Sequence, residues 1–379
     1  MKTCKLRWEG GNWTGDLTTS AADAQLVFLF GAGNLLRDEA VRSALRGGVP
    51  QARIVGCSTA GEILGSTVGD GGVVALAITF GSTQVRCAKR EVGAAEDSYD
   101  VGLALSQELA GEGLRHVILL SNGLKVNGTR LVAGLRQGLP DGVSATGGLA
   151  GDGSRFQDTT VVLDDDVGSA GVIAVGLYGS DLDVHWGSAG GWEAFGPRRR
   201  VTRSVNNVLY ELDNRPALEL YKTYLGERAE GLPATGLLFP LELLPEQEGD
   251  HSLVRTILAV DETEQSLTFA GDVPQDRYVR LMKSTIDKLI WGAETAGGMA
   301  GRPEEPPGFA LLVSCVGRRL VLNQRVEEEV EAVLDELGQP EGVIGFYSYG
   351  EIGPGGVTHG CELHNQTMTL TTFTEKSHG

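Results

Sequence analysis

The chain has 379 residues, and this length favours two domains or a duplicated one over a single core. Its composition, 41% hydrophobic and 22% charged, is that of a folded globular protein, and its 55 glycines suit many tight turns. The formal net charge of −18 argues against nucleic-acid and anionic-membrane partners, because both carry the same sign of charge.

The N-terminus and the cysteines predict a cytoplasmic protein without membrane insertion. No apolar signal region follows the N-terminal lysines, and no stretch reaches the roughly 18 apolar residues that a membrane span requires. The five cysteines are an odd number without a Cys-x-x-Cys pair. This pattern argues against a disulfide framework or a structural zinc site, and it favours a reducing compartment.

The first predicted unit covers residues 25–63. An apolar run at 25–30 predicts a buried strand, a helix is expected at about 35–46, and a second strand at 52–56 leads into GCSTAGEI. Residues 115–153 follow the same plan and end in GGLAGDG. Identities at a constant offset of 90 positions support a repeat: Leu45 with Leu135, Gly48 with Gly138, Pro50 with Pro140 and Gly61 with Gly151.

A third unit starts with the apolar segment 310–315, continues through a helix at 325–337 and ends in GFYSYGEI. Between the units lie β-rich segments, and residues 255–272 are typical of a hairpin. A long amphipathic helix is expected from Val279 to the glycines that end it near residue 298. The fold class is therefore mixed α/β, with repeated βαβ-like units, Gly-rich loops at strand ends, β-rich segments and two tandem domains.

The boundary between these domains is expected near residue 215. Asn214 suits a turn, and Pro216 suits the first position of a helix. This division gives one domain at 1–215 and another at 216–379.

The order of the motifs resembles the FIST sensory domain family over nearly the whole chain. Residues 1–215 resemble a FIST N-terminal domain through VGCSTAGEI, ATGGLAGDG and VTRSVNNVLYELDNRPALELYKTYLG. Residues 216–379 resemble a FIST C-terminal domain through LVRTILAVD, FAGDVP, SCVGRR, GFYSYGEI and LHNQTMTL. The tandem pair without an attached transmitter is similar to the nitric-oxide-sensing haem proteins often called NosP. That resemblance implies a non-enzymatic cytoplasmic sensor that regulates a separate histidine kinase or a cyclic-di-GMP enzyme, a diguanylate cyclase or phosphodiesterase.

The loop GCSTAGEI is a candidate ligand site at the end of a predicted strand. It offers the Cys57 thiol, the Ser58 and Thr59 hydroxyls, the backbone of Gly61 and the Glu62 carboxylate. Loops at the carboxyl ends of strands are where ligands bind in open α/β sheets. The alternative is a tight turn in which Glu62 binds backbone N–H groups.

The loop GGLAGDG adds Gly148 and Asp152 as candidate ligand contacts. It lacks the Lys and Ser/Thr of a P-loop and the G-x-G-x-x-G of a dinucleotide site. If the repeat at an offset of 90 is structural, Asp152 and Glu62 occupy equivalent positions and face the same pocket.

Four candidates belong to the third unit. Arg318 follows a buried strand, where it could meet a ligand carboxylate or a haem propionate, or pair with Glu62 or Glu351. Alternation places Tyr347 and Tyr349 on one side of the GFYSYGEI loop, as an aromatic wall or as ordinary packing. Because Glu62 and Glu351 end related loops, a pocket shared by the two domains is expected.

The segment HNQ at His364, Asn365 and Gln366 begins an alternating strand and is a further candidate contact. A structural histidine is the alternative for His364. For a haem sensor, His364, His251 and His185 are alternative axial ligands, and haem b would be held non-covalently because Cys-x-x-Cys-His is absent.

Two other functions compete with the haem-based sensor of nitric oxide. In a haem-free sensor of an amino acid or similar small metabolite, Glu62, Asp152 and Glu351 would bind the amine and Arg318 the carboxylate. In a hydrolase, the nucleophile would be Cys57, Ser58 or Thr59, with Cys57 as the main candidate, and a base within hydrogen-bond reach would have to activate it.

Overall fold

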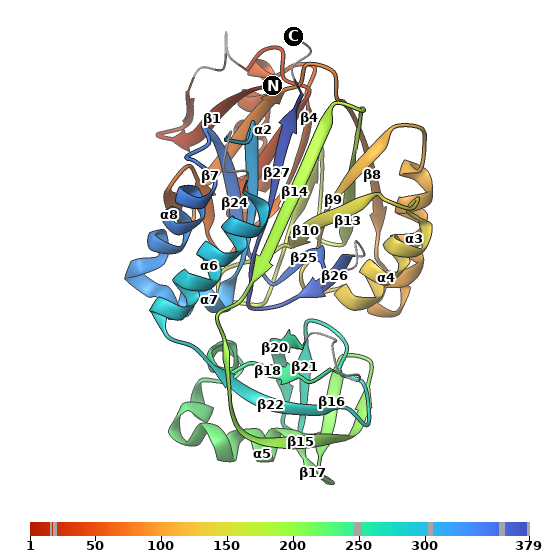
Figure 1. The fold of residues 1–379 in the computed structure, drawn as a ribbon, viewed down its shortest axis with the longest axis vertical. Helices are drawn as coiled ribbons and strands as arrows, with labels where there is room; N and C mark the ends of the chain where they lie inside the picture. Colours follow the sequence, from red (N-terminus) through yellow and green to blue (C-terminus); the bar gives the residue numbers. More distant parts are fainter. Residues whose placement is uncertain (16, 18–20, 246–251, 302–305, 356–360, 377–379) are drawn as a thin grey trace.

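The computed structural model describes residues 1–15, 17, 21–245, 252–301, 306–355 and 361–376. It confirms the mixed α/β class and shows a larger body built from three sheets, with a smaller part at one end of it (Figure 1). The N-terminus lies at the far end of the body from the smaller part. No helix among the described residues is both long and apolar enough to span a bilayer.

The three predicted units are present, and each contains two parallel strands joined through helices. The first comprises β3 (Leu26–Gly31), α1 (Gly33–Arg37), α2 (Glu39–Gly48) and β4 (Arg53–Ser58). The second comprises β9 (Leu114–Ser121), α4 (Gly128–Gly138) and β10 (Ser144–Leu149). The third comprises β23 (Phe309–Cys315), α7 (Val316–Leu322), α8 (Val326–Glu336) and β24 (Gly342–Ser348).

Two predicted helices differ from the observed ones. The helix expected at 35–46 is divided at Asp38, whose side chain accepts a hydrogen bond from the Ala40 N–H and so caps α2. The helix expected from Val279 begins only at α6 (Ile286–Ala300), capped by Thr285. Val279 lies instead in β22 (Tyr278–Lys283), because that segment pairs with neighbouring strands of the smaller part.

After its second parallel strand, each unit leaves its own sheet and adds a strand to the sheet of another unit. The first unit adds β5 (Glu62–Leu64) beside β24 of the third unit. The second adds β11 (Val161–Leu163) beside β4 of the first, and the third adds β25 (Gly350–Pro354) beside β10 of the second. Each continues into a hairpin with β6 (Thr67–Gly69), β12 (Asp166–Gly168) or β26 (Cys361–His364). The three sheets are therefore linked in a closed cycle, and the Gly-rich loops are its crossing points.

Each unit then returns to its own sheet and is completed by an outer strand. The returning strands are β7 (Val73–Thr79), β13 (Gly171–Tyr178) and β27 (Met368–Glu375). The outer strands that pair with them are β1 (Lys2–Glu9), β8 (Gln84–Glu91) and β14 (Leu182–Ala189). Aromatic side chains of the first and third units form much of the shared core, as in the rings of Phe30 and Phe346, whose centroids lie 4.6 Å apart.

The smaller part is inserted between β14 and α6 (Figure 1). Its elements are β15 (Glu193–Val205), β16 (Val208–Leu212), α5 (Ala217–Leu225), β18 (Leu241–Leu243), β19 (Leu253–Arg255), β20 (Ile257–Asp261), β21 (Ser266–Phe269) and β22. β20 and β21 form the predicted hairpin. The domain boundary near residue 215 stays a prediction; one sheet of the smaller part contains strands from both sides of it.

Candidate functional site

The three crossing loops meet inside the body, as the repeat predicts. Backbone hydrogen bonds join them in pairs: the Gly151 N–H to the Ser58 oxygen at 2.9 Å, the Ala60 N–H to the Tyr347 oxygen at 2.8 Å, and the Tyr349 N–H to the Leu149 oxygen at 3.1 Å. Their acids are almost completely buried, with exposed fractions of 3% for Glu62, 4% for Asp152 and 0% for Glu351. Each acid is held by its own set of donors rather than by an open cavity common to all three.

In the first loop, the polar groups bind one another. The Thr59 hydroxyl donates to Glu62 at 2.8 Å, and burial raises the pKa of Glu62. The Ser58 hydroxyl accepts the Thr160 N–H at 2.9 Å. Gly61 has a φ of +139°, a backbone conformation that residues with a Cβ rarely adopt, so a larger residue there would be strained.

In the second loop, Asp152 binds backbone N–H groups of residues 156, 157 and 158 at 2.9–3.1 Å. It also accepts a short hydrogen bond from the Tyr349 hydroxyl. Gly148 pairs with Glu351 across β10 and β25, and a Cβ on it would lie 2.6 Å from the Val313 side chain. This loop is therefore closely packed.

The Cys57 thiol lies in the apolar core of the body and is 0% exposed. Burial raises its pKa well above the ordinary value of 9.0. Because the thiolate is the reactive form of cysteine, this environment opposes a nucleophilic role for Cys57.

Arg318 forms a fully buried ion pair with Glu329 of α8, at 3.0 Å from Nε and 2.7 Å from Nη2. It also donates to the carbonyl oxygens of Gly190 and Leu289. Of the two alternatives for Arg318, pairing with Glu62 or Glu351 is wrong, because Glu329 reaches the guanidinium from α8. The Tyr347 hydroxyl donates to the same Glu329 carboxylate at 2.6 Å.

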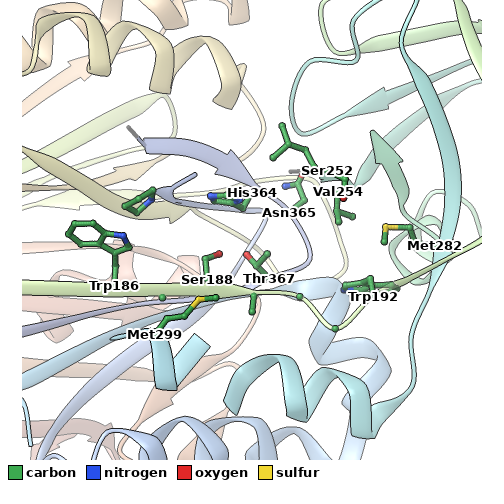
Figure 2. Close-up of a pocket in the computed structure, with 16 residues that line it drawn as sticks. Trp186, Ser188, Trp192, Ser252, Val254, Met282, Met299, His364, Asn365 and Thr367 are labelled. Atoms are coloured by element: carbon green, nitrogen blue, oxygen red, sulfur yellow. The ribbon is translucent and has the colours of Figure 1, made fainter. Parts of the chain in front are cut away.

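A pocket of about 560 Å³ lies where the body meets the smaller part (Figure 2). The body contributes β14, α6 and the segment after β26, and the smaller part contributes β19 and β22. Its lining includes Trp186, Ser188, Trp192, Ser252, Val254, Met282, Met299, His364, Asn365 and Thr367. Figure 2 shows Ser188 and Thr367 directed toward the wall that carries His364 and Asn365.

Asn365 is 1% exposed and lines this pocket, and only one of the two polar atoms of its side-chain amide has a hydrogen-bond partner among the described residues. Its Oδ1 accepts the Thr256 N–H at 3.3 Å, whereas Nδ2 has no hydrogen-bond partner among the described residues. Buried polar groups are nearly always hydrogen-bonded, so an unpaired donor at the pocket wall is unfavourable. Gln366 lies behind the pocket wall, where its Nε2 donates to the Leu237 oxygen at 2.9 Å.

Glu351 is connected to the pocket through hydroxyl groups. Its carboxylate accepts the Ser348 hydroxyl at 2.5 Å, and the Thr367 N–H and hydroxyl at 3.1 and 3.0 Å. Thr367 Oγ1 lies 3.0 Å from Thr369 Oγ1, which lies 2.7 Å from Ser188 Oγ. Burial raises the pKa of Glu351 to about 8, against the opposing effect of its hydrogen bonds.

Sequence reasoning found His364, Asn365 and Glu351 but missed Ser188, Thr367 and the two tryptophans. The alternating side chains of β14 and the motif GGW could have indicated these residues. The Trp192 indole of that motif donates a hydrogen bond to the Gln366 backbone oxygen at 2.9 Å. These residues become neighbours only because β14 and β26 border the same pocket from different sheets.

Of the three candidate haem ligands, His364 lines the pocket and His185 does not. His364 Nε2 lies 3.2 Å from the Gly353 oxygen, and His185 Nε2 lies 3.4 Å from Asp183 Oδ1. His251 lies outside the described residues. The tryptophans and methionines suit a flat apolar group, but the described lining has no Arg or Lys for haem propionates. It fits a small polar molecule better than haem.

Comparison with known proteins places the chain in a family. Residues 25–215 match the FIST N domain, and residues 217–354 match the FIST C domain. The uncharacterized protein Rv0628c of Mycobacterium tuberculosis is 28% identical over 271 residues, which are 68% of each chain. The uncharacterized protein MJ1623 of Methanocaldococcus jannaschii is 24% identical over 236 residues, which are 54% of this chain and 44% of the relative. The chain belongs to the FIST family, with a FIST N and a FIST C domain in tandem.

Proposed function

We propose that the protein senses a small polar ligand in the pocket between the body and the smaller part. FIST domains are small-ligand sensor domains of signalling proteins. The observation that carries the proposal is the buried Asn365 amide, whose Nδ2 has no acceptor among the described residues although it lines a pocket. Leaving such a donor without a partner is unfavourable, and a ligand carbonyl or carboxylate would satisfy it.

The pocket favours an amino acid or a similar small metabolite with one polar and one apolar portion. Asn365 offers a donor to a carbonyl or carboxylate, and the hydroxyls of Ser188 and Thr367 lie at the adjacent wall. The apolar portion would pack against Trp192 and Met282. A few placed polar groups within an otherwise apolar lining are typical of small-molecule sites.

The position of the pocket suggests how occupancy would be transmitted. The two chain segments that connect the body to the smaller part meet here, where the Ser284 hydroxyl donates to the Gly191 oxygen at 2.6 Å. A ligand that contacts both parts favours the arrangement in which both sets of contacts are made. We propose that a histidine kinase, a diguanylate cyclase or a phosphodiesterase binds the protein in this arrangement and is regulated by it.

A thermal-shift screen of amino acids and related metabolites tests the sensor, because a ligand of the native state raises the melting temperature by mass action. Asn365→Asp keeps the acceptor for the Thr256 N–H but replaces the Nδ2 donor with a carboxylate oxygen, so it should abolish the shift. Asn323→Asp, which makes the same change at an exposed position, is the matched control. An equal shift in all three proteins would overturn the assignment of this pocket.

A haem-based sensor of nitric oxide is the second candidate, and His364 is the observation that favours it. Its Nε2 contact with the Gly353 oxygen is the kind of second hydrogen bond that orients a metal-binding imidazole. Bound haem would supply the iron that nitric oxide binds. The test is a Soret band that stays with the protein after titration with haemin and removal of unbound haemin, with His364→Ala expected to lose it and His185→Ala to keep it. Absence of the band at saturating haemin would refute this candidate.

A further inference from the structure

Arg255 is a buried cation whose hydrogen bonds all go to neutral groups. It ends β19 and is 4% exposed. Its Nε donates to the Asp272 backbone oxygen at 3.0 Å, and Nη1 donates to the oxygens of Val254 and Leu363 at 3.2 and 3.3 Å. Within the described part of the chain, no carboxylate forms an ion pair with it, and Nη2 makes no hydrogen bond.

This arrangement is unusual because a guanidinium stays charged when it is buried. Burial lowers the pKa of Arg255 to about 10, while the charges of Asp272 and Glu362 oppose that change, so the group remains a cation at neutral pH. Buried charges in proteins are nearly always paired with an opposite charge. Arg318 in the same chain obeys this rule through Glu329, whereas Arg255 does not.

Arg255 borders a cavity of about 200 Å³ between the smaller part and helix α4. Arg136, in the last turn of α4, is exposed and lines the same cavity. Thr129 lines it as well; its hydroxyl oxygen accepts the Asp272 N–H at 3.1 Å, which leaves the hydroxyl hydrogen to donate elsewhere. Two guanidinium groups and a hydroxyl are the groups that bind oxyanions best.

We propose that this cavity is a binding site for a small oxyanion, a phosphoryl or carboxylate group, held by Arg255, Arg136 and Thr129. Arg255 belongs to the smaller part and Arg136 to the body, so the anion would join the two parts at a second cavity, which shares Leu253 with the Asn365 pocket. Glu362 also lines the cavity and its charge acts on Arg255, so its carboxylate would compete with the anion for that guanidinium. The site does not depend on the identity of the sensed ligand.

The test is titration of the full-length protein with inorganic phosphate, followed by ³¹P NMR and calorimetry, with sodium acetate as the carboxylate arm. Chloride holds the ionic strength constant, because electrostatic binding is screened by salt. Arg136→Gln should raise the Kd about tenfold, the effect of losing one charge-assisted contact of about 1.4 kcal/mol. Glu362→Gln should lower the Kd, since it removes the competing charge.

Arg130→Gln is the control, because Arg130 lies on the same helix outside the cavity. It should leave the Kd unchanged. Equal affinity of wild type, Arg136→Gln and Arg130→Gln would show that the anion binds elsewhere. Absence of saturable binding of either anion would overturn the proposal outright. Because Arg136 is exposed, Arg136→Gln should leave folding unchanged. Arg255 is buried, so a loss of binding in Arg255→Gln could reflect a loss of folding instead.

Discussion

The buried carboxyl group of Glu351 should make the stability of the protein fall as the pH rises, and Glu351→Gln should remove that fall. The folded-state pKa of about 8 lies above the ordinary value of 4.5. Between these two pH values the folded chain keeps a proton that the unfolded chain has released. Since the unfolded state then binds fewer protons, the free energy of unfolding decreases with increasing pH in this window.

The size of the effect follows from the two pKa values. Each unit of difference corresponds to about 1.4 kcal/mol, so the interval from 4.5 to about 8 is worth about 5 kcal/mol of unfolding free energy. Glutamine is neutral at every pH and nearly isosteric with glutamate. It therefore lacks the titration, although its amide cannot accept all the hydrogen bonds that Ser348 and Thr367 donate.

Other buried groups also affect how the free energy of unfolding depends on pH. His116, held between the hydroxyls of Ser144 and Thr146, has a pKa lowered by burial to about 3 from 6.5, so it adds stability as the pH rises through that range. It opposes Glu351 between pH 4.5 and 6.5. The raised pKa of Glu62 acts in the same direction as that of Glu351. The difference between wild type and Glu351→Gln isolates Glu351 from both.

The assay is urea unfolding of both proteins at several pH values from 5 to 9, followed by tryptophan fluorescence. The difference in unfolding free energy between wild type and Glu351→Gln should favour wild type at pH 5 and shrink by several kcal/mol by pH 8.5. A difference that stays constant over this range would refute the reasoning, since it would mean that Glu351 is already ionised in the folded protein at pH 5.

Three further predictions concern the buried networks. Glu329→Gln leaves the buried Arg318 without its counter-charge and should cost about 3–5 kcal/mol in urea unfolding. The same change at Glu328, whose side chain is 42% exposed, should cost much less, and equal costs would contradict the pairing. Tyr349→Phe removes the hydroxyl that binds Asp152 and should cost about 1–3 kcal/mol in the same assay, with no loss if the contact is absent. Cys57 should react with iodoacetamide no faster than the chain unfolds, because the thiol is buried and its pKa is raised. Labelling is mapped by mass spectrometry, and rapid labelling of the native protein would support a nucleophilic role for Cys57.

The repeated units could be predicted from the sequence because each one is local. An apolar strand, a helix and a second strand leave their pattern within about forty residues, and the offset of 90 between the first two units makes the repeat visible. The exchange of β5, β11 and β25 between sheets could not be predicted. The strand that each of them pairs with lies far away in the chain, and alternation of side chains is the same whichever sheet receives the strand.

The candidate site was predicted in part for the same reason. His364 and Asn365 were identified because polar residues at the start of a strand are a local signal, and both line the pocket. The burial of Glu62 and Asp152 was not visible, because a carboxylate in a Gly-rich loop looks the same whether it meets a ligand or backbone N–H groups. Only the packing of three loops against one another decides between these outcomes.

The three crossing loops are equivalent within the repeat but have different surroundings, because the smaller part is attached to the third unit. In the first and third loops a hydroxyl three residues before the acid donates to it, Thr59 to Glu62 and Ser348 to Glu351. The outer strand of the third unit, β14, leads into the smaller part, which supplies a second wall beside Asn365 and Thr367. The same local motif therefore serves packing at the first crossing and borders a pocket at the third. The position of the inserted segment, rather than the repeated motif, therefore determines where this pocket lies.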